Sequence, residues 1–389
     1  MKQHHTRPME PGPATANSMP ATHSGASRQP FSNDSSTVNL LTGDAEQVLA
    51  TLPANSADCV VTSPPYWRLR DYATGTWSGG SPDCPHPANA VVKIAVQTAN
   101  TPRCCTSCGA SWTDGQYGLE STADAYVTQL RKVFAELRRV LSPTGTAWLN
   151  LGDSYATNSD GYWCTRPGQY RQPRYRPAAD VPHKNLLGMP WRVALALQSD
   201  GWILRNAIVW HKANAAPFPV RDRLSCHYET IFLLVQQPYY YFDLDPIRQP
   251  YTGDRSPSRR AHRGGNKPHT ARGIWPPPAD DDRAVRTARG RNPGDVWSVP
   301  VTPRRHQAHP AAFPIEIPRR CIAAGCPPGG VVLDPFSGTG TTGLAARQLG
   351  RSYIGIDLNA AFQAGATARL ARQVCCPGAA TPVGKEETA

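Results

Sequence analysis

The strongest constraint on the fold is an apolar run that breaks into a glycine-rich turn late in the chain. Residues 331–342 read Val-Val-Leu-Asp-Pro-Phe-Ser-Gly-Thr-Gly-Thr-Thr. The leading apolar residues suit a buried parallel strand, while Gly338 and Gly340 permit positive φ and a close approach of the backbone to a ligand. Thr341 and Thr342 are expected to cap the following helix, so that its free N–H groups face the turn. The pattern predicts a strand–turn–helix unit that holds a ligand at the turn.

A second short strand follows this unit and also ends in a carboxylate. Residues 351–357 read Arg-Ser-Tyr-Ile-Gly-Ile-Asp, and an acid at the end of the second strand commonly binds ribose hydroxyls. The turn lacks both the third spaced glycine of a dinucleotide site and the lysine of a P-loop, so neither fingerprint fits. Acids at two successive strand ends, Asp334 and Asp357, favour a nucleotide-cofactor site over an ordinary βαβ turn.

A different loop ends an apolar run near the start of the chain. Residues 58–67 read Asp-Cys-Val-Val-Thr-Ser-Pro-Pro-Tyr-Trp. Pro64 and Pro65 fix φ and donate no hydrogen bond, and Pro64 also holds Ser63 in an extended conformation. The outward carbonyls and the Ser63 hydroxyl can accept the two N–H bonds of an amino group, while the Tyr66 ring can stack on a planar base. A polyproline-like turn is the plain alternative, which the position directly after a strand disfavours.

Together, these two loops resemble those of site-specific DNA methyltransferases that modify an exocyclic amino group, making N4-methylcytosine or N6-methyladenine. The catalytic loop precedes the cofactor loop here, which resembles the circularly permuted order of the β class. The resemblance covers about residues 37–376. Ser337 stands where many relatives have another small residue. Four further segments resemble parts of the family: Leu41–Asp44, Leu149–Ser154, Ile208–Lys212 and Phe313–Pro314.

The resemblance implies an α/β fold of the Rossmann-like type found in S-adenosylmethionine-dependent methyltransferases. Such a fold has a mostly parallel sheet flanked by helices, and both loops would lie at the carboxyl ends of neighbouring strands. S-adenosyl-L-methionine would lie across the glycine-rich loop, with its ribose on Asp357 and its adenine near Asp44. The loop residues expected to contact it are Asp334, Pro335, Phe336, Ser337, Gly338, Gly340, Thr341 and Thr342.

The resemblance also implies the chemistry of the Ser-Pro-Pro-Tyr loop. The catalytic residues would be Ser63, Pro64, Pro65 and Tyr66. The target base would leave the duplex and stack on Tyr66, and its amino group would donate to Ser63 and to the Pro64 carbonyl. A serine before the prolines favours cytosine N4 in this family, whereas an aspartate favours adenine N6. The alternatives are N6-adenine methylation, methylation of RNA or of a small molecule, and an inactive zinc-containing DNA-binding protein.

A cysteine and histidine constellation predicts a structural zinc site. Cys84-Pro-His86 is followed about twenty residues later by Cys105-Thr-Ser-Cys108, and this gives four ligands of the kind that zinc prefers. Scattered thiols are the alternative. Cys104 could replace Cys105, but the two-residue spacing to Cys108 favours Cys105. The zinc would brace an insertion at residues 73–120 and take no part in the chemistry.

The charge of the chain predicts a polyanionic partner. The net charge is +12 and the sequence pI is about 9.3, which favours double-stranded DNA as the partner. Arginines and lysines concentrate at residues 255–267, inside a stretch (250–300) where the family has its target-recognition region. A solvated linker is the alternative there. A cognate restriction endonuclease is a further expected partner, while the sequence indicates neither the recognition site nor the oligomeric state.

The remaining composition sets the expected boundaries and location. Residues 1–36 read as a disordered leader, residues 37–376 as the catalytic domain, and residues 377–389 as a disordered tail. No apolar run reaches 18 residues and the start lacks an apolar signal core, so we expect a cytoplasmic, nucleoid-associated protein with no membrane contact. The eleven cysteines of a chain this long do not suggest a disulfide scaffold.

Overall fold

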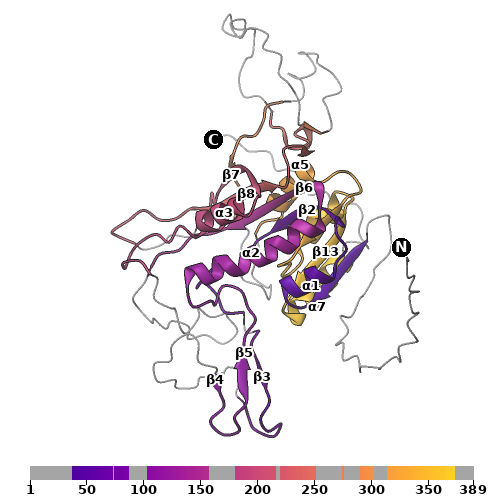
Figure 1. Ribbon diagram of the computed structural model, residues 1–389. Helices are drawn as coiled ribbons and strands as arrows, with labels where there is room; N and C mark the ends of the chain where they lie inside the picture. The colour runs from indigo at the N-terminus through magenta and orange to yellow at the C-terminus, as the bar shows by residue number, and fades with distance from the viewer. Residues whose placement is uncertain are drawn as a thin grey trace, which may run out of the picture.

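An eight-stranded sheet forms the centre of the fold in the computed structural model (Figure 1). In spatial order its strands are β1 (Val38–Thr42), β13 (Ser352–Asp357), β12 (Val331–Asp334), β2 (Ala57–Thr62), β6 (Leu141–Leu151), β8 (Tyr228–Val235), β7 (Ile203–His211) and β11 (Val296–Ser298). Neighbouring strands are parallel except where β8 pairs with β6 and β7. The expected mostly parallel sheet is therefore confirmed. The structure describes residues 37–72, 74–86, 103–156, 180–215, 220–250, 274–275, 290–301 and 313–372.

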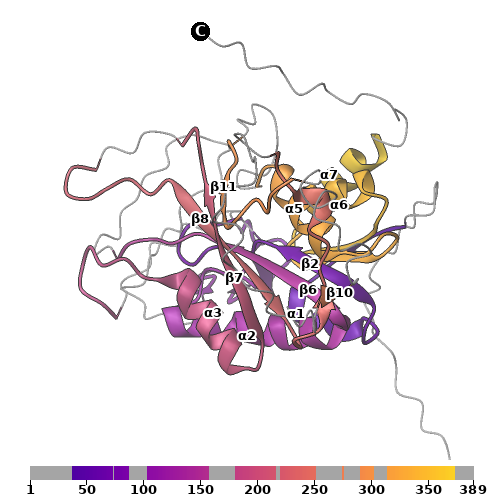
Figure 2. The same cartoon turned by 90° about the horizontal axis from the view of Figure 1, so that it is seen from above.

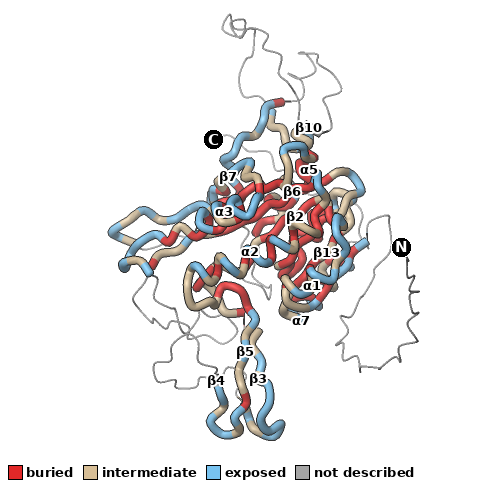
Figure 3. The backbone as a smooth tube through the Cα atoms, viewed as in Figure 1, coloured by how far each residue is buried: buried red, intermediate tan, exposed pale blue. Residues whose placement is uncertain are grey.

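Helices cover both faces of this sheet (Figure 2). One face carries α1 (Ala45–Thr51), α2 (Ala123–Val140) and α3 (Met189–Ser199), and the other carries α5 (Glu316–Gly325), α6 (Thr341–Gln348) and α7 (Ala360–Arg372). Alternation along the strands builds a separate core on each face. In β6, for example, Leu149 packs toward α2 while Trp148 packs toward α5. Figure 3 shows this burial concentrated on the central strands.

Local sequence explains where these helices begin. Thr122 caps α2 by accepting a hydrogen bond from the backbone N–H of Ala125 at 3.0 Å. The predicted capping of α6 is wrong. Gly340 is the N-cap in a left-handed conformation, with φ of 72°, and Thr341 and Thr342 are the first two helical residues. Their hydroxyls bond elsewhere, because both threonines already belong to the first turn of the helix.

The segment around the cysteines projects from the body as an antiparallel arm (Figure 1). It comprises β3 (Thr76–Ser78), β4 (Arg103–Cys104) and β5 (Ser111–Thr113), which form their own sheet in the order β3-β5-β4. Three short elements lie elsewhere: β9 (Tyr240–Tyr241), β10 (Ile274–Trp275) and the 3-10 turn Asp245–Ile247. None of the helices in the described part of the chain combines the length and the apolar character that a membrane crossing requires.

The sheet order brings the two distant loops together. β2 leads into the Ser-Pro-Pro-Tyr loop and β12 leads into the glycine-rich loop, and these strands are parallel neighbours, with Cys59 opposite Val332 and Val60 opposite Leu333. Because both strands run in the same direction, both loops emerge at the same edge of the sheet. The expected juxtaposition at neighbouring strand ends is confirmed.

Candidate active site

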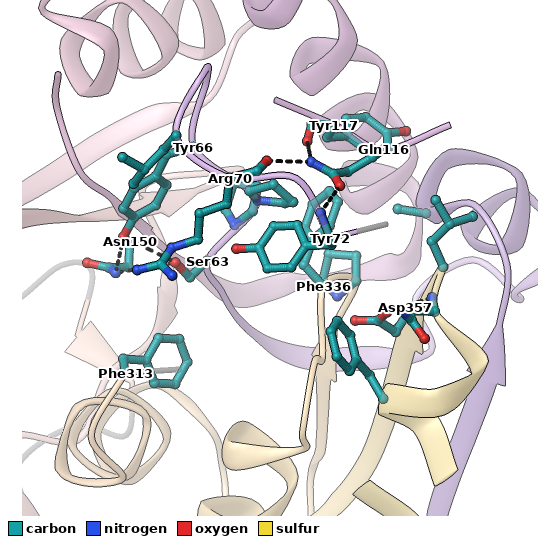
Figure 4. Close-up of a pocket in the computed structure, with 18 of the residues that line it drawn as sticks. Ser63, Tyr66, Arg70, Tyr72, Gln116, Tyr117, Asn150, Phe313, Phe336 and Asp357 are labelled. Carbon is teal, nitrogen blue, oxygen red and sulfur yellow. Dashed lines mark hydrogen bonds between the residues drawn. The ribbon is translucent and has the colours of Figure 1, made fainter. Parts of the chain in front are cut away.

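A cavity of about 300 Å³ opens at the carboxyl edge of the sheet, between the two loops. All four residues of the Ser-Pro-Pro-Tyr loop line it (Figure 4). Of the predicted cofactor residues, Pro335, Phe336 and Asp357 line it as well. The cavity therefore extends from the acid at the end of β13 to the loop after β2.

The Asp334 carboxylate acts as a brace behind this cavity. It is only 2% exposed and accepts hydrogen bonds from Thr62 Oγ1 at 2.7 Å, Thr342 Oγ1 at 2.6 Å and Phe336 N at 3.1 Å. Burial raises the pKa of Asp334 to about 6, against the lowering effect of these bonds. Its contacts tie the end of β2 to the start of α6, and this holds both loops in one arrangement.

The other loop residues form the scaffold of the turn. Gly338 and Gly340 have φ of 50° and 72°, as their predicted role in a tight turn requires. A Cβ atom at Gly340 would lie 3.2 Å from the Cβ of Ala366 on α7. Thr341 Oγ1 accepts a hydrogen bond from Arg369 at 3.0 Å, and Ser337 N donates to the Ile356 carbonyl at 2.8 Å.

Asp357 is held by the turn and faces the cavity. Its Oδ2 accepts from Gly338 N at 2.8 Å and its Oδ1 accepts from Asn359 N at 2.8 Å. Burial raises the pKa of Asp357 above the usual value, and the two backbone donors oppose that rise. Each carboxylate oxygen accepts one backbone bond and retains a lone pair, so a pair of vicinal hydroxyls can still donate to it.

Aromatic rings form the walls at this end of the cavity. Phe336 packs edge-on against Tyr117 with ring centroids 5.2 Å apart, and Phe362 packs edge-on against Tyr72 at 6.2 Å. Asp44, predicted to lie near an adenine, caps α1 by accepting from Gln47 N at 3.0 Å. Its carboxylate lies beside Tyr117 and, after burial, is the main cause that raises the pKa of that phenol. Flat apolar walls of this kind suit a planar ring.

A hydrogen-bond network joins the Ser-Pro-Pro-Tyr loop to β6 and β8. The Tyr66 hydroxyl donates to Glu229 Oε2 at 2.5 Å and lies 3.4 Å from Ser63 Oγ. Asn150 Nδ2 donates to Tyr66 at 2.9 Å, to Glu229 at 2.8 Å and to Ser63 at 3.3 Å. Burial, and then the Glu229 carboxylate, raise the pKa of Tyr66 well above its usual value. The phenol is therefore protonated in the resting site, and these hydrogen bonds fix its ring at the cavity wall.

Sequence reasoning missed the acid in this network. Glu229 Oε1 accepts from Lys212 Nζ at 2.5 Å, and both side chains are largely buried. Lys212 follows the end of β7 and Glu229 lies at the start of β8, so the antiparallel pairing of these strands sets them at the same edge as the loops. The Trp-His-Lys segment was a usable signal, but nothing near Glu229 in the sequence marked it.

Close packing sets the position of the Tyr66 ring. A Cβ atom at Gly152 would lie 2.6 Å from the ring, and one at Gly118 would lie 2.9 Å from the Tyr66 carbonyl. The Pro65 carbonyl accepts from the Tyr126 hydroxyl of α2 at 2.9 Å. In the described part of the chain no donor binds the Pro64 carbonyl, which leaves that acceptor available to a ligand.

The four predicted metal ligands converge in the projecting arm. The ligand atoms of Cys84, His86, Cys105 and Cys108 all lie within 4.8 Å of one another. Cys84 Sγ lies 3.7 Å from Cys105 Sγ, and His86 Nε2 lies 2.9 Å from Cys108 Sγ. Backbone N–H groups of Ser107 and Ala110 lower the pKa values of Cys105 and Cys108, respectively. Cys104 instead lies beside Ser111 Oγ and is exposed.

Several predicted regions fall outside the residues that the structure describes. These are the leader at 1–36, the tail at 377–389 and the basic segment at 255–267. The target-recognition stretch at 250–300 is described only at residue 250, at 274–275 and from residue 290 onward.

An open α/β sheet with a carboxylate-flanked glycine turn beside a proline-containing loop is the arrangement expected of a group-transferring enzyme that uses a nucleotide-like cofactor. The profile of the N6/N4 DNA methylase family matches residues 57–368. The chain belongs to this family of DNA methyltransferases.

Individual relatives agree with this assignment. The Type II methyltransferase M.SmaI of Serratia marcescens is 34% identical over 338 residues, covering 86% of this chain and 91% of the relative. The Type II methyltransferase M.Cfr9I of Citrobacter freundii is 35% identical over 325 residues, covering 82% and 83%. The solved structure of the PvuII DNA methyltransferase, described as cytosine-N4-specific, has a TM-score of 0.52 at 16% identity, covering 85% of this chain and 86% of that chain. That likeness shows a shared fold.

Proposed function

We propose that this DNA methyltransferase transfers a methyl group from S-adenosyl-L-methionine to the N4 amino group of cytosine within a specific duplex site. The observation that carries the proposal is the position of Ser63. Its hydroxyl lies at the end of β2, beside the glycine-rich loop that follows the neighbouring strand β12. A serine before two prolines is the family pattern that favours cytosine over adenine.

The residues at the β13 end of the cavity fit the cofactor. The spare lone pairs of Asp357 suit ribose hydroxyls, and the rings of Phe336 and Tyr117 suit an adenine. When bound, the cofactor supplies an electrophilic methyl group on a sulfonium. The brace at Asp334 would act indirectly, by holding the turn that these residues share.

The protein groups at the other end of the cavity would hold the target amino group. Ser63 Oγ accepts one N–H and the Pro64 carbonyl accepts the other, which favours a more tetrahedral nitrogen with a directed lone pair. The base lies against the fixed ring of Tyr66. Most of the acceleration then comes from positioning and from preorganised acceptors.

The same network gives the departing proton a route. As the amino nitrogen gains a methyl group, it must lose one proton. Ser63 takes that proton while passing its own to the Tyr66 oxygen, and Tyr66 passes its own to Glu229. The path ends with a neutral Glu229 beside Lys212, and the charge returns when solvent removes the proton.

We also propose a structural zinc ion in the arm. Tetrahedral zinc with Zn–S bonds of about 2.3 Å requires sulfur atoms about 3.8 Å apart, and the Cys84–Cys105 separation of 3.7 Å agrees with this. Purified protein should contain about one zinc per chain by elemental analysis. Cys105→Ser should lose it, while the adjacent Cys104→Ser should keep it. If neither variant loses the zinc, or if both lose it equally, this ligand set is wrong.

Mass spectrometry of nucleosides tests the reaction. DNA from a host that expresses the chain should contain N4-methylcytosine, and DNA from a host that expresses Ser63→Ala should contain far less. N6-methyladenine would overturn the base assignment and leave the mechanism standing. C5-methylcytosine, or no methylation at cofactor saturation, would overturn the mechanism. Since the relatives are named Type II methyltransferases, we infer that a cognate restriction endonuclease shares the site.

A further inference from the structure

Arg70 carries a positive charge into the cavity close to the Ser-Pro-Pro-Tyr loop. It lines the cavity, and Figure 4 shows its side chain pointing toward Ser63 and Asn150. Its backbone is firmly held, because the buried Gln116 donates from Nε2 to the Arg70 carbonyl at 2.8 Å and accepts from Tyr72 N at 2.6 Å. The main chain is thus anchored by Gln116, while the Arg70 side chain lines the cavity.

The guanidinium has no partner among the residues that the structure describes, neither by hydrogen bond nor by ion pair. The two carboxylates that line the cavity are already engaged. Glu229 accepts from Tyr66, Asn150 and Lys212, while Asp357 accepts from two backbone N–H groups. A partly buried arginine with all five donors available in a ligand cavity is suited to a ligand with adjacent acceptors.

A flipped cytosine has such a pair of acceptors. An enzyme that extrudes a base reads it through hydrogen bonds to its Watson–Crick edge. When the N4 amino group lies at Ser63, the next two positions along that edge are N3 and O2, which both accept. Adenine at the same place offers N1 and then a C2–H group, which accepts nothing. A guanidinium presents two parallel N–H groups and matches only the cytosine edge.

We propose that Arg70 reads the N3 and O2 atoms of the flipped target cytosine and is a specificity-determining residue for the base. This inference rests on the proposed N4-cytosine activity. Arg70 would then disfavour adenine because it binds cytosine better. The residue before the two prolines, Ser63, would be a second determinant of the base.

The test is a double-mutant cycle between the protein and the base. The duplex carries a site located by sequencing methylated host DNA, with its target cytosine intact or replaced by 3-deazacytosine, which has C–H in place of N3. Single-turnover methyl transfer is measured at saturating enzyme and cofactor. Arg70→Met should be slower on cytosine by about tenfold to a hundredfold, from the discrimination of a bidentate contact. Arg70→Lys should fall between Arg70→Met and the wild type.

The coupling between the two changes decides the result. Wild-type enzyme should lose rate on 3-deazacytosine, while Arg70→Met should lose little more than it has already lost. If Arg70→Met and 3-deazacytosine lower the rate independently, so that their effects multiply, the proposal is wrong. A cofactor dissociation constant that rises with the loss of rate would also overturn it, and would assign Arg70 to the cofactor carboxylate. A flattened salt dependence of DNA binding in Arg70→Met would assign it to a phosphate instead.

Two controls separate this inference from the proposed function. Arg205→Gln removes an exposed guanidinium near the amino end of β7, which donates to the Tyr240 hydroxyl, and it should behave as wild type in every assay. If wild-type enzyme makes N6-methyladenine or nothing, the proposed function itself has failed. If wild-type enzyme makes N4-methylcytosine and the cycle shows no coupling, only the role of Arg70 has failed.

Discussion

Asp334→Asn should make the stability of the protein less dependent on pH. The carboxyl of Asp334 is 2% exposed, and burial raises its pKa from the ordinary value of 3.8 to about 6. A difference of about 2 pKa units corresponds to about 3 kcal/mol between the protonation states, at about 1.36 kcal/mol per unit. Folding therefore opposes ionisation of this group by roughly that amount at neutral pH.

The sign follows from the direction of the shift. Because the folded-state pKa of Asp334 lies above that of an exposed carboxyl, its contribution to stability is complete below about pH 4 and is lost as pH rises through about 6. An asparagine side chain does not ionise in this pH range, so it adds no such pH dependence to the stability. Its Oδ1 can accept from Thr62 and Phe336 N, and its Nδ2 can donate to Thr342 Oγ1, whose hydroxyl can turn to the Val61 carbonyl 3.4 Å away.

Urea unfolding at pH 5 and pH 8 measures the effect. From pH 5 to pH 8, the unfolding free energy of Asp334→Asn should rise relative to that of wild type by about half of the 3 kcal/mol. The other part of the loss in wild type occurs below pH 5. Asp124→Asn, at an exposed position on α2, is the control for removing a carboxylate. Equal changes in the unfolding free energies of wild type and Asp334→Asn between the two pH values would refute the reasoning.

Four further predictions address cofactor binding, methyl transfer and DNA binding. Asp357→Ala should weaken S-adenosylmethionine binding on the order of tenfold to a hundredfold, as expected for hydrogen bonds to a charged group, and calorimetry that finds unchanged affinity would remove its ribose role. Tyr66→Ala should remove stacking worth roughly 1–3 kcal/mol and slow methyl transfer more than it weakens cofactor binding. Tyr66→Phe keeps the ring and removes the proton route, so a wild-type single-turnover rate would refute that route. Deleting residues 255–267 should flatten the salt dependence of DNA binding, and an unchanged slope would identify a plain linker.

The sequence predicted the elements that have a clear apolar pattern. β12 and β13 were recognisable because buried parallel strands are continuous apolar runs, and the Ser-Pro-Pro-Tyr loop was recognisable because prolines restrict the backbone. The four ligands in the arm were identified by their spacing, and the structure brings them together.

Contacts between side chains on different strands could not be predicted from the sequence. Asp334 was expected to contact the cofactor, and its role as a brace depends on Thr62, a partner on a neighbouring strand 272 residues away. Glu229 enters the network only because β8 runs antiparallel between β6 and β7. Spatial strand order decides which side chains meet at the carboxyl edge, and a local pattern does not encode that order. Arg70 was overlooked for the same reason, since its place in the cavity depends on Gln116.

The adjacency of β2 and β12 has a consequence for how the enzyme is made. At about 5–20 residues per second, a ribosome needs roughly 15–50 s to add the 272 residues that separate Thr62 from Asp334. Throughout that interval β2 lacks the neighbour on one side, and its apolar edge needs protection from other chains. A chain that stops before residue 331 has the Ser-Pro-Pro-Tyr loop but no complete cavity. DNA modification can therefore begin only after β12 and β13 have been made.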